Sequence, residues 1–282
     1  MFLAKLTIEI VVYASIIFYK KGVIMNILKE KIKKKEKVCG TLVSLAEPCS
    51  CELLGNIGYD CVWIDMEHSH MSYKDVLCHL NSAKSANIQS IVRLPQDDLT
   101  ATKKILEMGP DGIIFPMIRS AEEAKKLIEM TLYPPYGTRG FGPLRAIGYG
   151  SVDAKDYVKN KSMDLCRFIQ IESISAINEL EEIIKNPYID GFIFGPNDLS
   201  GSVGEILDVF GEKTSSAVKR AVDILKAHDK YFGFAIGTSE LEIKNWTSFN
   251  PHMLFTGADW CFMFAKGQET LEKSKKYMFE VK

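Results

Sequence analysis

The chain has 282 residues, of which 46% are hydrophobic and 25% are charged, an ordinary composition that allows a sizeable buried core. Its formal net charge is −1, so the charge balance gives no support to a nucleic-acid partner, and we expect none. The seven cysteines are an odd number and contain no CxxC pair. We therefore interpret them as reduced, buried, small hydrophobic residues of a cytoplasmic protein.

The first 24 residues differ in character from the rest of the chain. Residues 10–19 form an uncharged apolar run, too short for the roughly 20 residues that span a bilayer. It also lacks the small-residue cleavage site of a secretory signal. Because Met25 opens an ordinary amphipathic segment, we favour it as the natural start, with an N-terminal extension of residues 1–24 and one domain of residues 25–282. The alternative is a weak membrane anchor assisted by the basic residues 29–37.

From residue 38 onward, short apolar runs alternate with helical segments. Continuous apolar runs are typical of strands that are buried on both faces of a parallel sheet. Helix starts lie between them: Ser72 precedes residues with helical spacing, and Ser120 with Glu123 forms a capping-box pattern. The runs that we assign to strands are residues 38–45, 61–65, 90–94, 112–116, 166–171, 191–194, 232–236 and 253–256.

Eight strands that alternate with helices predict a single closed (β/α)8 barrel of the α/β class. The alternative is an open doubly wound sheet, which needs a glycine-rich phosphate-binding turn after an early strand. No GxGxxG pattern occurs in the chain, so we favour the barrel. In such a barrel the chemistry takes place at the carboxyl ends of the strands, and candidate residues are to be sought there.

Two long loops interrupt the alternation. Residues 133–150 are rich in glycine, proline and aromatic side chains and carry two arginines, so we expect an ordered lid or a contact between subunits. Residues 195–211 contain four glycines, which allow the backbone to wrap closely round a ligand and to present N–H groups to an anion.

Two acidic residues follow neighbouring strands of the predicted barrel. Glu172 comes directly after the run 166–171, and Asp198 follows the run 191–194. Because parallel strands end at the same mouth, we expect the two carboxylates to lie near each other. Carboxylate oxygens are ligands of hard divalent cations such as Mg²⁺ or Mn²⁺, so the pair predicts a cation whose shell is completed by water and substrate oxygens.

Three further side chains at strand ends complete the candidate set. Arg93 can fork onto a keto-acid oxygen or a carboxylate. His68 is an acid/base near neutral pH, and Asp65, three residues earlier, could orient its imidazole. No lysine lies in the eight strand runs, which argues against Schiff-base chemistry inside the barrel.

Six short motifs follow one another along the chain: WIDMEH at 63–68, VRLP at 92–95, FPM at 115–117, YPPYGTRG at 133–140, QIE at 170–172 and GPNDLS at 195–200. In this order they resemble the HpcH/HpaI aldolase family, over roughly residues 26–280. That family includes 2,4-dihydroxyhept-2-ene-1,7-dioate aldolases and 2-keto-3-deoxy sugar-acid aldolases. The resemblance implies a class II pyruvate aldolase on a barrel of the phosphoenolpyruvate/pyruvate type.

The resemblance also implies roles for residues at the mouth. Glu172 and Asp198 would be the ligands of a divalent metal, Mg²⁺ or Mn²⁺, with Co²⁺ as a further candidate. Gln170 would lie beside the metal and the substrate. The backbone at Asn197 and Asp198 would receive the carboxylate of pyruvate.

The remaining implied roles concern charge and protons. Arg93 would contact the keto oxygen of pyruvate and stabilise the enolate, while His68 with Asp65 would relay protons. An acidic residue from a neighbouring subunit is also expected near the substrate, and the matching turn carries Glu107 where the family often has Asp. Members of the family are typically hexamers, or trimers of dimers, in which the last helix swaps between partners, so we expect a homo-oligomer.

The activity that the resemblance implies is a carbon–carbon lyase reaction. A 4-hydroxy-2-oxo acid would be cleaved to pyruvate and an aldehyde through the pyruvate enolate held at the metal. Two alternatives are a citryl-type lyase that acts on a thioester and a barrel without catalytic activity. The sequence shows no basic cluster for the phosphates of a coenzyme A thioester, and the residues at the strand ends are intact, so we favour the aldolase.

Overall fold

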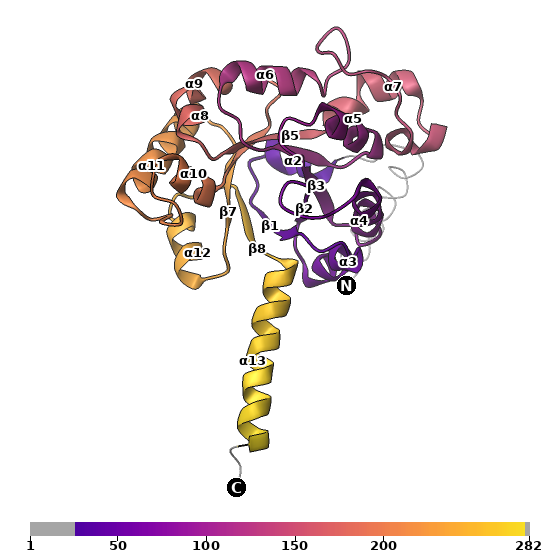
Figure 1. Ribbon diagram of the computed structural model, residues 1–282. Coiled ribbons are helices and arrows are strands. Elements are labelled where there is room, and N and C mark those ends of the chain that lie inside the picture. Colours follow the sequence, from indigo (N-terminus) through magenta and orange to yellow (C-terminus); the bar gives the residue numbers. More distant parts are fainter. Residues whose placement is uncertain (1–25, 280–282) are drawn as a thin grey trace, which may run out of the picture.

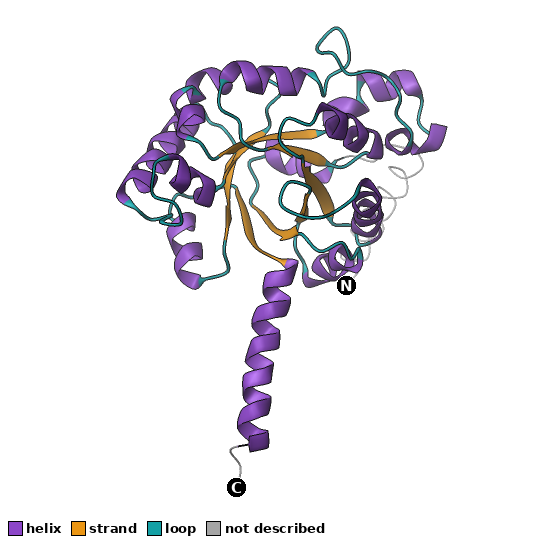
Figure 2. Cartoon of the chain, viewed as in Figure 1, coloured by secondary structure: helices purple, strands orange, loops and turns teal. Residues whose placement is uncertain are grey.

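The computed structural model describes residues 26–279, and its centre is a closed barrel of eight parallel strands (Figure 1). Neighbouring strands pair in chain order, and β8 pairs with β1, so the predicted (β/α)8 fold is confirmed. Figure 2 shows the strands at the centre with helices around them. The predicted extension of residues 1–24 lies outside the described residues.

The observed strands follow the predicted runs closely. Four coincide with them, β3 is shifted by one residue, and the other three differ by one or two residues at one end. The largest differences are at β1, which ends at Val43, and at β8, which continues to Ala258. The strands are β1 Val38–Val43, β2 Cys61–Asp65, β3 Gln89–Arg93, β4 Gly112–Phe115, β5 Cys166–Ile171, β6 Gly191–Phe194, β7 Phe232–Ile236 and β8 Met253–Ala258.

The early end of β1 is caused by the carboxylate of Asp259, which follows the neighbouring strand β8. The backbone N–H groups of Ser44 and Leu45 donate to the two carboxylate oxygens of Asp259, at 3.1 and 3.2 Å. These groups are therefore satisfied by a side chain instead of a neighbouring strand. The apolar pattern could not show this difference, because it reports burial and not the hydrogen-bond partner.

Helices separate the strands, and polar N-cap side chains mark many of their starts. Ser72 forms a complete capping box with Asp75. The hydroxyl oxygen of Ser120 accepts from the backbone N–H of Glu123, as predicted. The Glu123 carboxylate accepts from the backbone N–H of Arg119, one residue before the N-cap. The helices are α2 Ile27–Lys33, α3 Cys49–Ile57, α4 Tyr73–Ser85, α5 Leu99–Met108, α6 Ala121–Glu129, α7 Ala154–Lys159, α8 Ile174–Asn178, α9 Leu180–Ile183, α10 Pro196–Ser202, α11 Glu212–Ala227, α12 Glu240–Thr247 and α13 Asp259–Phe279, with 3₁₀ turns at Arg145–Gly150 and Lys161–Asp164.

Helix α2 packs under the barrel at the amino ends of the strands. Its Leu28 and Ile32 are buried in one cluster with Trp63, Phe168 and Phe255 from the barrel interior. The side chain of Asn26, the N-cap of α2, donates to the carbonyl groups of two residues next to the starts of β4 and β5. The interior is thus a packed core, and the carboxyl ends of the strands remain as the open mouth.

Helix α13 leaves the barrel and projects away from it (Figure 1). Several of its large apolar side chains are exposed, among them Trp260, Met263 and Phe264. Asp259 is buried at its first turn and fixes the start of the helix to the end of β1. Of the helices in residues 26–279, none combines the length and the apolar character needed to cross a membrane.

Candidate active site

The strand register places Asp65 of β2 and Arg93 of β3 directly beside each other at the mouth. The guanidinium donates from Nε to Oδ1 at 2.9 Å and from Nη2 to Oδ2 at 2.6 Å. Burial alone would raise the pKa of Asp65, but the fork from Arg93 and two backbone N–H donors lower it below its ordinary value. The centre of the Trp63 ring lies 5.1 Å from the guanidinium carbon, so the ring face stabilises the cation. Arg93 is therefore a fixed cation.

Glu67 contributes a second carboxylate to the same guanidinium. Its Oε2 atom lies 3.1 Å from Nη1 of Arg93, and only 11% of its side chain is exposed. Burial raises the pKa of Glu67, the charges of Arg93 and His68 lower it, and those of Asp65 and Asp198 raise it further. The sequence places Glu67 within a matching motif, but residue-type reasoning gave it no role.

His68 lies at the rim with 64% of its side chain exposed, and its Nε2 atom is 3.9 Å from Oε2 of Glu67. The predicted partner, Asp65, is engaged elsewhere. Its two oxygens receive the fork from Arg93, and Oδ1 also accepts from the backbone N–H groups of Glu67 and His68. The structure thus gives Asp65 a different partner from the imidazole that we expected.

Glu172 follows β5 and is almost fully buried, with 1% of the residue exposed. Its Oε1 accepts from the backbone N–H of Met117, and its Oε2 accepts from Nε2 of Gln170 at 2.5 Å. Burial is the main cause that raises its pKa to about 7, and the charges of Glu67 and Asp198 raise it further. The N–H of Met117 and the charge of Arg93 lower this pKa only in part, so burial and the two neighbouring carboxylates prevail.

Two neighbouring residues have backbone features that make room for the Glu172 side chain or bind it. Gly195, after β6, lies so close that a Cβ atom there would be 2.8 Å from both Gln170 Nε2 and Glu172 Oε2. Met117 has a positive φ of 54°, an uncommon conformation for a residue with a side chain, and its N–H donates to Glu172. Neither requirement has a signature in residue type alone, although both residues lie in the matching motifs.

Asn197 and Asp198 lie in the first turn of α10 and are exposed. The first backbone hydrogen bond of this turn runs from Leu199 N to Gly195 O, so the N–H groups of both residues precede it. Asp198 lies within electrostatic range of Glu172 and Glu67, since it raises the pKa of each. The predicted pair of carboxylates is therefore brought to one mouth.

The donor set at this mouth fits a hard divalent cation. Oε1 of Gln170 is buried, and among residues 26–279 it has no hydrogen-bond partner. A nearby cation would stabilise the charged form of Glu172, and it would give the buried amide oxygen of Gln170 an interaction partner. Within the described part of the chain, no three His, Cys, Asp or Glu side chains gather in the manner of a complete protein cage. Two carboxylates suit an ion whose other ligands are small oxygen donors.

Glu107 lies apart from this mouth within one chain. It occupies the last turn of α5, which leads from the end of β3 back toward the start of β4. There its Oε1 atom is 3.4 Å from Nη2 of Arg139, a buried side chain that also bonds to the hydroxyl group of Tyr157. The expected contribution of Glu107 from a neighbouring subunit therefore stays a prediction.

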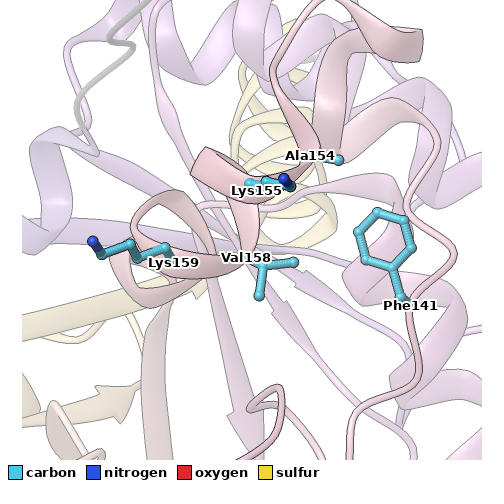
Figure 3. Close-up of a pocket in the computed structure, with 5 residues that line it drawn as sticks. All are labelled: Phe141, Ala154, Lys155, Val158 and Lys159. Atoms are coloured by element: carbon cyan, nitrogen blue, oxygen red, sulfur yellow. The ribbon is translucent and has the colours of Figure 1, made fainter.

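The loop at residues 133–150 is ordered, as predicted, but it lies at the amino-end side of the barrel, because it joins α6 to the segment before β5. Arg145 fixes it to the carbonyl of Met108 at the end of α5. The prediction that this loop forms a lid over the mouth of the same chain is therefore wrong, whereas the contact between subunits stays a prediction. The loop and α7 border a surface hollow away from the strand tips (Figure 3), lined by Phe141, Ala154, Lys155, Val158 and Lys159.

Comparisons with known proteins point to one family. The family model described as HpcH/HpaI aldolase/citrate lyase matches residues 39–249. A hydroxypyruvate/pyruvate aldolase of Paraburkholderia phytofirmans is 34% identical over 77% of this chain and 84% of its own. A 2-keto-3-deoxy-L-rhamnonate aldolase of Escherichia coli is 29% identical over 76% of this chain and 80% of its own.

A solved structure extends the agreement to the fold. A family protein from Burkholderia cenocepacia superposes with a TM-score of 0.83 at 25% identity, covering 89% of this chain and 99% of that one. The family and the enzyme character predicted from the motifs are confirmed: the chain belongs to the HpcH/HpaI aldolase/citrate lyase family.

Proposed function

We propose that this enzyme is a divalent-metal-dependent class II pyruvate aldolase, which cleaves a 4-hydroxy-2-oxo acid to pyruvate and an aldehyde. One observation carries the proposal: a fixed guanidinium, Arg93, shares the mouth with the buried carboxyl group of Glu172, whose pKa is raised to about 7. This arrangement suits a reaction in which negative charge develops on a keto oxygen. The relatives named hydroxypyruvate/pyruvate aldolase and 2-keto-3-deoxy-L-rhamnonate aldolase support the substrate class.

Glu172 and Asp198 would hold the metal, Mg²⁺ or Mn²⁺, with Co²⁺ as a further candidate, and Gln170 would lie beside it. When bound, the cation supplies positive charge that stabilises the developing enolate. Two observations support this placement: Oε1 of Gln170 has no partner within residues 26–279, and the missing side chain at Gly195 lets Gln170 and Glu172 lie close to the strand end.

The protein's own groups would perform the remaining steps. Arg93 would donate to the keto oxygen, and its fork with Asp65 keeps it oriented before the substrate arrives. Backbone N–H groups at Asn197 and Asp198 would bind the carboxylate. His68 would take the proton from the 4-hydroxyl group as the carbon–carbon bond breaks, and would return a proton to C3 of the enolate.

We also propose that the enzyme is a homo-oligomer, a hexamer or trimer of dimers, in which α13 packs on another copy. Figure 1 shows α3 and α12 on either side of the start of α13, and these two helices also carry exposed apolar side chains, Leu53, Ile57 and Leu241. Burying these faces against each other would remove both from water. A neighbouring copy would also supply Glu107 to the mouth.

Two further proposals concern surroundings and partners. The seven cysteines are all free thiols, which supports a cytoplasmic location. The partners at the mouth would be a small keto acid and an aldehyde, and we propose no nucleic-acid partner for a chain of net charge −1.

The test is pyruvate release from a panel of 4-hydroxy-2-oxo acids by the full-length protein. We expect EDTA to abolish release and Mn²⁺ or Mg²⁺ to restore it, and we expect Glu172→Gln to lose both activity and metal affinity. A coenzyme A thioester consumed in preference to every free keto acid would instead establish the citryl-type lyase. Metal binding without turnover of any member of the panel would indicate a barrel without catalytic activity.

A further inference from the structure

One carboxylate oxygen at the mouth, Oε2 of Glu67, lies between two nitrogen atoms. It is 3.1 Å from Nη1 of Arg93 and 3.9 Å from Nε2 of His68. The atom is shielded from solvent and, within residues 26–279, accepts no hydrogen bond of good geometry. A buried carboxylate oxygen in this position retains unused acceptor capacity, which is costly unless a donor approaches.

Arg93 Nη1 is the nearer of the two nitrogen atoms, and the second belongs to His68. Its side chain is 64% exposed and therefore free to rotate, and a shift of about 1 Å would bring Nε2 within hydrogen-bond distance of Oε2. Asp65 is less suited to this role, because Nε and Nη2 of Arg93 already occupy its two oxygens. The ion pair with Arg93 in turn holds the Glu67 carboxylate in place.

We propose that Glu67 is the positioning residue for His68: Arg93 anchors its carboxylate, and that carboxylate orients the imidazole for proton transfer. The inference rests on the proposed aldolase function and transfers the imidazole partner from Asp65 to Glu67. Asp65 then orients the side chain of Arg93 and not that of His68. The two carboxylates, although two residues apart, have separable effects on the reaction.

The charges that face Glu67 come from several elements. Arg93 of β3 and the neighbouring His68 attract its negative charge, whereas Asp65 of β2, Asp198 of α10 and Glu172 after β5 oppose it. Glu67→Gln removes the charge but keeps the size of the side chain, so it tests the orientation of His68 without opening a cavity. Glu67→Asp keeps the charge and shortens the reach, which provides a second variant if the first folds poorly.

The experiment is a double-mutant cycle with Glu67→Gln, His68→Ala and the double variant. The readout is the exchange of pyruvate methyl protons with deuterated water in the presence of Mg²⁺, followed by NMR. We expect His68→Ala to slow exchange by about 10²-fold and Glu67→Gln by at least about tenfold. The double variant should be no slower than His68→Ala within about threefold, because Glu67 acts through His68. Losses that multiply would overturn the inference.

A second measurement separates Glu67 from Asp65. Oxalate has the shape and charge of the pyruvate enolate, and its affinity in the presence of Mg²⁺ reports on Arg93. We expect Glu67→Gln to keep oxalate affinity within about threefold, and Asp65→Asn to weaken it by at least about tenfold, since only Asp65 fixes the fork. Loss of oxalate affinity in Glu67→Gln equal to that in Asp65→Asn would mean that Glu67 merely supports Arg93.

The controls distinguish this inference from the proposed function. Glu122→Gln changes a glutamate in the first turn of α6, outside the machinery described above, and should exchange at the wild-type rate. A wild-type enzyme without metal-dependent exchange would overturn the aldolase function and this inference with it. A wild-type enzyme that exchanges, with His68→Ala slow and Glu67→Gln unchanged, would overturn the inference alone.

Discussion

A Cβ atom on Gly195 would lie 2.8 Å from Oε2 of Glu172, closer than side-chain carbon atoms approach a neighbour without moving it. The glycine therefore defines where the carboxylate can lie. We expect Gly195→Ala to displace Glu172 and to lower kcat/KM for pyruvate formation by about 10²-fold, the cost of a misplacement of about 1 Å at a reacting centre. Steady-state kinetics with saturating Mn²⁺ measure this effect.

The matched control is Gly142→Ala, because a Cβ atom on Gly142 meets no atom within 4 Å. This variant should retain wild-type kcat/KM. Equal activity in Gly195→Ala and Gly142→Ala would show that the position of Glu172 is not critical.

Glu172 also predicts how the metal-free protein responds to pH. Its pKa is raised from 4.5 to about 7 in the folded state, so between these values the folded state binds a proton that the unfolded state has lost. Stability therefore falls as pH rises through this window, by up to about 3 kcal/mol from this group. Thermal melting with EDTA should show wild type losing more stability than Glu172→Gln between pH 5 and pH 8.

Addition of Mn²⁺ supplies the control for that measurement. A cation favours the charged carboxylate, so it should restore the stability of the wild-type protein at pH 8 and leave Glu172→Gln nearly unchanged. Identical pH dependence of the two proteins without metal would exclude Glu172 as the source.

The barrel could be predicted from the sequence because its signals are local. Continuous apolar runs marked the strands, and caps such as Ser72 marked the helix starts, since both depend on neighbours in the chain. The end of β1 at Val43 escaped prediction because it depends on Asp259, more than 200 residues away. Burial patterns carry no information about such a partner.

The sequence predicted which residues lie at the mouth better than it predicted which of them contact one another. Asp65, Arg93, Glu172 and Asp198 meet at one mouth, as parallel strand ends require. Which acid contacts Arg93, however, follows from strand register, which pairs Asp65 with it directly. The expected contact between Asp65 and the His68 ring assumed proximity in sequence, whereas the geometry is set across strands.

Asp65→Asn should lower the stability of the protein as well as its catalytic activity. The Arg93 side chain is 7% exposed and that of Asp65 3%, so removal of one charge leaves the other buried without its principal partner. We expect a loss of about 3–5 kcal/mol in the free energy of unfolding, measured by chemical denaturation. Asp223→Asn breaks an exposed pair with Lys219 and should cost less than about 1 kcal/mol. Similar losses in the two variants would contradict a structural role for the fork.

The last prediction concerns α13. Met263 and Phe264 are each about two-thirds exposed on a helix that projects from the barrel, an arrangement that favours burial against another copy. We expect wild-type protein to have a mass in solution several times its chain mass of 31.7 kDa. The double substitution of glutamate for Met263 and Phe264 should shift the protein toward smaller species, because charges would be buried in the contact.

Light scattering coupled to size-exclusion chromatography measures this shift. Lys275→Glu, a change of charge near the outer end of the same helix, serves as the control for the effect of charge alone. If α13 also positions the copy that supplies Glu107, the Met263 and Phe264 variant should lose pyruvate formation while it retains affinity for Mn²⁺, since Glu172 and Asp198 come from one chain. Monomeric wild-type protein with full activity would contradict both the oligomer and the contribution of a neighbouring copy.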